Sequence, residues 1–172
     1  MRKVALAVVL ALVAVPAAFA ADSPSPSNQA NALCKQQRTA MGTKDFTSLY
    51  GGSKNAFGRC VSKLTGSVEK DTANASKQCA AERADAAFAG AHDGKTFDQF
   101  YGTGKHGSNA FGKCVSSKAQ TQTDAKQQAT LNASKTCKAE RKQMGAAPFT
   151  QKYGGHSNAF GKCVSKAAQA TP

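Results

Sequence analysis

The stretch Asn-Ala-Phe-Gly-(Lys/Arg)-Cys-Val-Ser occurs three times in the chain, at residues 55–62, 109–116 and 158–165. Three segments precede each copy in the same order. They are Cys-x3-Arg, a Gly-rich break and Phe-x3-Tyr-Gly. The chain is therefore a tandem repeat of three units, which we place at residues 31–65 (unit 1), 73–120 (unit 2) and 131–168 (unit 3). This pattern describes a scaffold and does not indicate a reaction.

The first residues have the pattern of a secretory signal. A basic start at Arg2 and Lys3 precedes the apolar residues 4–15, and a small-x-small pattern ends at Ala20. The apolar stretch is shorter than the ~20 residues that span a bilayer, and no later stretch is long enough to do so. We therefore predict a signal peptide at residues 1–20, no transmembrane anchor, and a secreted protein, either extracellular or in the periplasmic or cell-envelope space.

Two parts of the chain depart from the repeat. Residues 21–30, with prolines among serines, predict a disordered leader. Unit 2 carries six extra residues between Cys79 and Tyr101 and three more between Tyr101 and Asn109. These insertions fall where loops are expected, and loops vary freely but also carry most recognition chemistry.

Large apolar residues are scarce after the signal. Residues 21–172 contain four Leu, four Val, eight Phe and no Ile or Trp, which is 16 of 152 residues. This share lies below the roughly 20% under which a highly charged chain tends towards disorder. An even number of cysteines in an exported chain favours disulfides. Three of them would contribute about 3.5 kcal/mol each, so we expect reduction to unfold the protein.

The segments between units favour cysteine pairing inside each unit. Residues 70–89 and 118–142 are rich in Ala, Gln and Lys and favour helix on propensity. On a continuous helix Cys60 and Cys79 would lie about 28 Å apart, far beyond the roughly 7 Å between Cα atoms that a disulfide allows. A fold-back at residues 66–67 or 121–123 would reopen the other pairings. The favoured pairs are Cys34–Cys60, Cys79–Cys114 and Cys137–Cys163.

Each unit is predicted to contain two helices joined by a short helical bridge. The first helix carries Cys-x3-Arg and ends near a glycine such as Gly42 or Gly145. The bridge carries the Phe and Tyr of Phe-x3-Tyr on one face, at i and i+4. The Asn of the repeat is the predicted N-cap of the second helix, whose Phe, Cys and Val form a narrow apolar face. The glycines that would allow another helix to approach closely are Gly58, Gly112 and Gly161. The predicted fold is all-α and elongated, with three tandem disulfide-stapled helical units joined by helical linkers.

No catalytic or metal-binding set recurs across the units. The histidines do not repeat, and the acid at Glu82 and Glu140 is replaced by Gln37 in unit 1. Acid/base and nucleophilic catalysis need polar groups held together, and redox activity would favour a Cys-x-x-Cys motif, which the sequence lacks. We therefore predict no enzyme, no cofactor and no metal. The weakest alternative is a small hydrolase with a single site built on His92, Asp93 and Asp98.

The arginine and the aromatic pair of each unit both allow two interpretations. The arginines could form a row of anion-binding forks, or each could lie along the bridge aromatics and donate hydrogen bonds to helix-end carbonyls. The Phe and Tyr rings could form a platform for sugars or bases. With so few large apolar residues, we expect them to form the core.

Excess positive charge is the one feature that implies a partner. The chain carries a net charge of +13, and +11 without Arg2 and Lys3, since 21 basic residues then face 10 acidic ones. Such a surface attracts anionic polymers through salt-sensitive contacts, although the charge could equally serve to keep the protein soluble. The candidate anion-binding residues are Arg38, Arg83, Arg141, Lys113, Lys138, Lys142 and Lys162.

The blocks Asn-Ala-Phe-Gly-Lys-Cys-Val-Ser and Tyr-Gly-Gly resemble repeats in uncharacterised exported proteins of bacteria, over nearly the whole chain after the signal. The resemblance implies export and a modular build, and it adds no catalytic residue. We expect a secreted, non-enzymatic binding or structural protein that associates with anionic polymers or an envelope component. The alternative is a secreted effector, either an antimicrobial or an inhibitor of an extracellular enzyme.

Overall fold

The computed structural model describes residues 24–52, 54–103, 107–154 and 158–170, and within these ranges the chain forms helices and no strand. The predicted all-α, disulfide-stapled fold is confirmed. The predicted signal peptide lies outside the described residues. The helices are α1 (Pro26–Met41), α2 (Thr43–Leu49), α3 (Ala56–Ala84), α4 (Phe88–Ala91), α5 (Phe97–Tyr101), α6 (Ala110–Met144), α7 (Ala146–Tyr153) and α8 (Ala159–Gln169).

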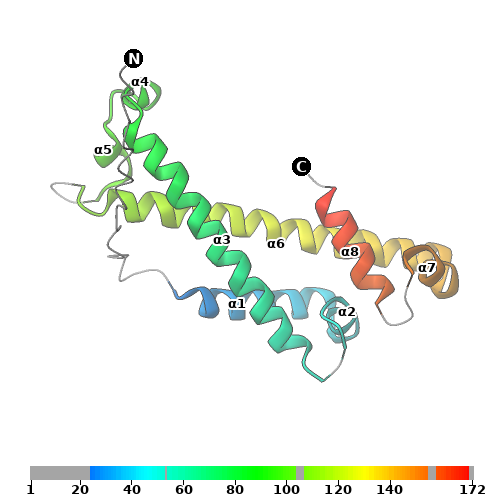
Figure 1. Cartoon of the computed structure of the whole chain (residues 1–172). Coiled ribbons are helices and arrows are strands. Elements are labelled where there is room, and N and C mark those ends of the chain that lie inside the picture. The colour runs from blue at the N-terminus through cyan, green and yellow to red at the C-terminus, as the bar shows by residue number, and fades with distance from the viewer. Residues whose placement is uncertain (1–23, 53, 104–106, 155–157, 171–172) are drawn as a thin grey trace, which may run out of the picture.

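Two long helices each belong to two units (Figure 1). α3 carries Cys60 of unit 1 and Cys79 of unit 2, and α6 carries Cys114 of unit 2 and Cys137 of unit 3. At 1.5 Å per residue these helices are about 44 Å and 53 Å long. The predicted helical linkers are therefore confirmed, and the chain does not fold back at residues 66–67 or 121–123.

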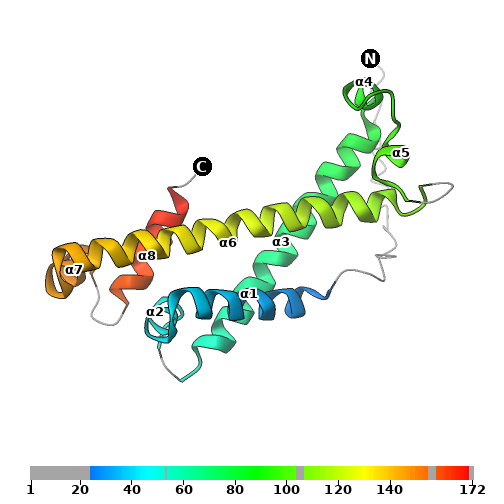
Figure 2. The same cartoon turned by 180° about the vertical axis from the view of Figure 1, so that it is seen from behind.

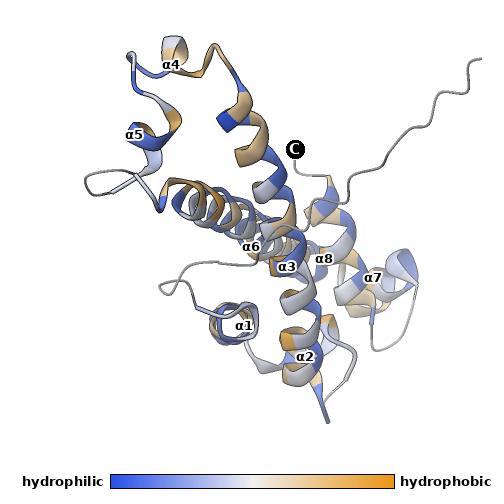
Figure 3. Ribbon diagram, turned by 60° about the vertical axis from the view of Figure 1, so that its left-hand side comes forward, coloured by the Kyte–Doolittle hydropathy of each residue, from blue (hydrophilic) through white to orange (hydrophobic). Residues whose placement is uncertain are grey.

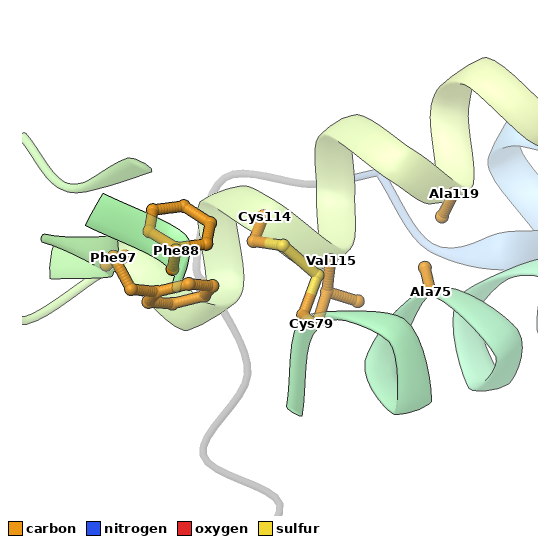
Figure 4. Close-up of a cluster of buried hydrophobic side chains, with 8 residues drawn as sticks. Ala75, Cys79, Phe88, Phe97, Cys114, Val115 and Ala119 are labelled. Atoms are coloured by element: carbon orange, nitrogen blue, oxygen red, sulfur yellow. A yellow bond between two sulfur atoms is a disulfide. The ribbon is translucent and has the colours of Figure 1, made fainter. Parts of the chain in front are cut away.

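Each disulfide closes inside one unit, as predicted. The two Cα atoms are 6.0 Å apart in every pair, and all six cysteines are at most 1% exposed. Around each disulfide a small apolar cluster forms, which includes the bridge phenylalanine of that unit. In unit 2, Cys79 and Cys114 join α3 to α6, with Phe88 and Phe97 on one side and Ala75 and Ala119 on the other (Figure 4).

The bridge helices are α2, α5 and α7, and their rings belong to the core. Phe46, Phe97 and Phe149 are 1–6% exposed, which confirms that the rings are packed inside rather than displayed. Each lies 4.8–5.0 Å, between ring centroids, from the tyrosine four residues later. The first helices of units 1 and 3 end where predicted, because Gly42 and Gly145 take positive φ angles of 79° and 86° that other residues rarely adopt.

Units 1 and 3 lie against each other, while part of unit 2 projects away from them. α1 packs against α6 and α2 packs against α8, so the first and last units share an interface (Figures 1 and 2). Leu49 of α2 contacts the core clusters of both units. The helices α4 and α5 of unit 2 stand apart from α1, α2, α7 and α8, at the junction of α3 and α6 (Figure 3). The contact between units 1 and 3 adds a feature that the repeat pattern did not predict.

The start of α1 corrects the predicted disordered leader over residues 26–30, while residues 21–23 lie outside the described residues. Helix α1 begins at Pro26, and Ala30 is fully buried. The Ser25 hydroxyl accepts a hydrogen bond from the Asn28 backbone N–H, and proline suits the first turn of a helix because it has no N–H to satisfy. The prolines and serines that suggested disorder are therefore, in part, a helix start.

The repeated asparagine holds the predicted N-cap position but does not cap with its side chain. Asn55, Asn109 and Asn158 precede α3, α6 and α8, and none of their side chains accepts from the first turn. The Oδ1 atoms of Asn55 and Asn158 instead lie 2.5 Å from the position that a Cβ atom would take at the glycine three residues later. Glycine therefore leaves room for the asparagine side chain.

Candidate functional site

A groove of about 700 Å³ lies where α2 of unit 1 meets α6, α7 and α8 of unit 3. Its charged lining consists of four cations and one anion, so the groove carries a net charge of +3. The apolar part of the lining includes Phe149 and Phe160. We call this site the basic groove, and its charged residues are Lys44, Asp45, Lys138, Arg141 and Lys142.

Asp45 is the buried anion around which the groove is built. Gly42 ends α1 and lets the chain turn into α2, whose first turn carries Asp45. Arg141, in the last turn of α6, donates two hydrogen bonds of 2.8 Å and 3.2 Å to the Asp45 carboxylate. Lys138 lies 3.6 Å from the same carboxylate and donates to the Met41 carbonyl. Asp45 is only 5% exposed, so these two cations neutralise a charge that would otherwise be costly to bury.

Arg141 also lies over a ring of the repeat. Its guanidinium carbon is 5.0 Å from the centroid of Phe160, within range of a cation–π interaction. The carboxylate that Arg141 binds belongs to the protein itself, and the ring that it covers is Phe160 rather than a bridge aromatic. Arg38 and Arg83, at the same repeat position, are exposed and make no ion pair within the described residues.

Lys44 and Lys142 are the cations that the groove can offer to a ligand. Both side chains are exposed, and among the described residues neither makes an ion pair. The nearby threonine hydroxyls, Thr47 and Thr150, donate to carbonyls of their own helices. An anion in the groove would therefore contact two ammonium groups, with Lys138 and Arg141 behind them.

No protein-family model, curated protein or solved structure matches the chain.

The seven candidate anion-binding residues lie in three different settings. Lys138, Arg141 and Lys142 line the basic groove. Lys162 donates to the Gly154 carbonyl at the end of α7, as Arg59 donates to the Gly51 carbonyl after α2, so this basic position closes the end of a bridge. The remaining three are exposed and lie outside the groove, namely Arg38, Arg83 and Lys113.

Sequence reasoning missed Lys44 and Asp45. The pair Lys-Asp before the bridge phenylalanine occurs in unit 1 only, where units 2 and 3 have Lys-Thr and Ala-Pro. The available signal was Asp45 itself, which is an acid next to a core phenylalanine in a strongly basic protein and has no equivalent in the other units. Its partner could not be identified, because Arg141 is 96 residues away.

A second polar cluster recurs beside each disulfide. The bridge tyrosine donates to the side chain three residues after the first cysteine, from Tyr101 to Glu82 at 2.9 Å and from Tyr153 to Glu140 at 2.8 Å. Burial opposes ionisation of Glu82, but hydrogen bonds from Lys118 and Tyr101 outweigh it and lower its pKa. Hydrogen bonds from Lys152 and Tyr153 likewise lower the pKa of Glu140. Both carboxyls are therefore charged at neutral pH, which is unlike a general acid.

In unit 1 the same position is Gln37, which accepts from Tyr50. Desolvation by burial raises the pKa of Tyr50 to about 12, against the opposing effect of the Gln37 hydrogen bond. The polar cluster of unit 1 is thus neutral and buried, whereas those of units 2 and 3 are charged and partly open.

The residues of the hydrolase alternative lie around α4 and α5 of unit 2, since His92 follows α4 and Asp98 lies in α5. The ring of His92 stacks with Phe88 and Phe100, at 4.1 Å and 4.3 Å between centroids. Across the described residues, no three His, Cys, Asp or Glu side chains gather in a way that could hold a metal ion. None of the described helices combines the length and apolarity needed to cross a membrane.

Proposed function

We propose that the protein is a secreted, non-enzymatic binding protein that holds anionic polymers, such as envelope polymers, in the basic groove. The observation that carries the proposal is the arrangement of charge there. Lys138 and Arg141 form ion pairs with the buried Asp45, while Lys44 and Lys142 are exposed beside them. A ligand's negative charge would meet a net charge of +3 from residues that the fold holds in place.

Export is supported by the signal pattern of residues 1–20, by the three disulfides and by the resemblance to exported repeat proteins. Disulfides persist in oxidising compartments and are rare where thiols are kept reduced. An extracellular or envelope location would also place the protein among polymers that carry phosphate and carboxylate groups.

The test compares two double variants of equal charge. Lys44→Gln with Lys142→Gln removes the free cations of the groove. Lys77→Gln with Lys95→Gln removes two exposed cations of unit 2 that lie outside the groove. Retention on purified wall polymer, on envelope and on duplex DNA is measured from about 50 mM to 200 mM salt, the range over which phosphate contacts weaken steeply.

We expect the groove variant to bind more weakly to each polymer that retains the wild type. On DNA, the magnitude of the slope of log affinity against log salt should fall by about 2, since each phosphate contact contributes about 0.9. The unit 2 variant should change little. An equal loss of polymer binding in both variants would mean that the positive charge of the whole surface binds the polymer without a specific site, and the proposal would be wrong. Dye release from anionic vesicles, at salt that abolishes polymer retention, would favour the effector alternative instead.

A further inference from the structure

In the contact between α2 and unit 3, the surface on unit 3 also occurs in the other units of the repeat. On unit 3, α2 covers a surface formed by Arg141, Phe160 and Gly161, which we call the Arg-Phe-Gly face. A Cβ atom at Gly161 would lie 2.9 Å from the Ser48 carbonyl oxygen and 3.2 Å from the Leu49 Cα atom, so glycine lets the backbone of α2 approach. Leu49 packs against the core of unit 3 at this point.

The corresponding face of unit 1 is uncovered. Phe160 is 3% exposed and Gly161 is buried beneath α2. In unit 1 the equivalent Phe57 is only half-buried, and both Arg38 and Gly58 are exposed. The three atoms nearest to a Cβ atom at Gly58 all belong to the Asn55 side chain, whereas at Gly161 two of the three belong to the backbone of α2. The molecule therefore contains one covered Arg-Phe-Gly face and an open copy of it.

The face of unit 2 is less open than that of unit 1. Gly112, its glycine, lines a hollow of about 250 Å³ together with Pro24, Ser25 and Pro26 at the start of α1. The N-terminal segment of the described chain thus already lies beside it. Unit 1 presents the face that is free for a partner.

Unit 2 presents the matching half of the contact. Phe100 lies immediately before the bridge tyrosine, which is the repeat position that Leu49 holds in unit 1. Where Leu49 is half-buried between two units, Phe100 is 44% exposed, although it is a large apolar side chain. Unit 3 has Lys152 at this position, and that lysine pairs with Glu140. The Phe100 ring contacts Phe88, His92 and Tyr101 of its own unit, and the rest of this apolar side chain is open to solvent.

We infer that a second copy of this chain is the partner, and that α5 of one molecule docks through Phe100 on the Arg-Phe-Gly face of unit 1 of the next. The two surfaces lie at opposite ends of α3, since Gly58 is in its first turn and α5 is bonded through Tyr101 to Glu82 near its end (Figure 1). Because the two surfaces differ, two molecules can exchange both contacts around a two-fold axis, or each can bind a further molecule. The first case gives a closed dimer and the second gives a ring or an open chain of molecules.

The contact is mainly apolar and does not involve the basic groove. Unit 2 has Thr96 where unit 1 has Asp45, so docking would not reproduce the bidentate ion pair with Arg141. Association should therefore resist salt that abolishes polymer binding. This difference separates the inference from the proposed function, because either can fail while the other holds.

The experiment measures the molar mass of the oxidised full chain, by sedimentation over a series of concentrations, for two interface variants and their controls. Phe100→Lys removes the apolar side chain, and Ala86→Lys adds the same charge to an exposed site of unit 2 while keeping Phe100. Gly58→Ala blocks the close approach, and Gly66→Ala adds the same methyl group further along α3, where nothing lies within 4 Å.

We expect the wild type and both controls to grow in mass with concentration to a dimer or beyond, and each interface variant to remain monomeric on its own or to associate more weakly. Mixed together, the two interface variants should form a one-to-one dimer and stop, because each retains one intact half of the contact. A wild type that stays monomeric would overturn the inference. So would association that survives Phe100→Lys, which an exchange of α1 and α2 between molecules would produce.

Discussion

Gln37 stands where units 2 and 3 carry a glutamate, and its surroundings explain the exchange. It is 1% exposed, donates to the Gln127 Oε1 atom at 2.6 Å and accepts from Tyr50. Gln127 in turn donates to the Leu33 carbonyl. A carboxylate at this position would be desolvated against α6 and would have no hydrogen to give to Gln127. The amide satisfies both neighbours without a charge.

Replacing this amide should make stability depend on pH. We expect Gln37→Glu to lower the free energy of unfolding by about 2–4 kcal/mol at neutral pH, because it buries a carboxylate against an acceptor. Burial raises the pKa of such a carboxyl in the folded state, so the cost is absent below its unfolded pKa and grows as the pH rises through the folded value. Urea unfolding of variant and wild type, at several pH values, measures the difference.

The neighbouring Gln36 supplies the control for this variant. Its side chain is exposed, so Gln36→Glu should change stability by less than about 0.5 kcal/mol at every pH. A loss in Gln37→Glu that is the same in acid and at neutral pH would contradict the explanation, since it would not come from a buried charge.

At the residue scale the sequence showed the exchange at Gln37 but not its cause. The repeat alignment places Gln37 with Glu82 and Glu140, which argued against a repeated acid site. The reason lies in Gln127, which is 90 residues away. Spacing within a repeat predicts contacts inside a unit, and it contains no information on which unit will cover another.

The packing of α2 on α8 depends on the absence of a side chain at Gly161. We expect Gly161→Ala to destabilise the protein by about 1–3 kcal/mol, because the added methyl group would lie against the backbone of Ser48 and Leu49, which cannot move aside as a flexible side chain would. Thermal or urea unfolding measures this loss.

Gly66→Ala is the matched control for this prediction. Gly66 lies within α3, and a Cβ atom there would have open space around it. Alanine should therefore stabilise the helix by about 0.5–1 kcal/mol, through its better helix propensity alone. If both alanines stabilise the protein, α2 and α8 are not in close contact.

At the element scale most of the fold could be predicted. Residue spacing indicated the bridge helices, the glycines that end the first helices and the continuous linkers, because each depends on neighbours within a few turns. The basic groove could be predicted only in part. Lys138 and Lys142 were candidates, but Lys44 and Asp45 belong to no repeat, and their position opposite Arg141 depends on how α1 and α2 return to unit 3.

The whole molecule is held by three cross-linked clusters rather than by one core. Each cluster includes a disulfide and a few apolar residues, and the helices α1, α3 and α6 also bury the polar side chains of Asp71, Thr123 and Gln127. Such clusters are too small to offset the entropy of the chain without the disulfides, each of which contributes about 3.5 kcal/mol.

Reduction should therefore remove the fold as a whole. We expect a reductant to abolish most of the helical circular dichroism and the cooperative unfolding transition at room temperature, since the three disulfides together supply about 10 kcal/mol. The oxidised protein in the same buffer is the control. Helical signal and a sharp transition that persist with all six thiols free would show that packing alone suffices.

The three disulfides close consecutive loops that neither overlap nor enclose one another. During synthesis from the N-terminus, every second cysteine of a pair emerges when only one unpaired cysteine precedes it. An oxidase that joins thiols in their order of arrival would therefore make the native set directly, with no bond to break and reshuffle. The arrangement of the repeat thus allows the chain to mature without a disulfide isomerase.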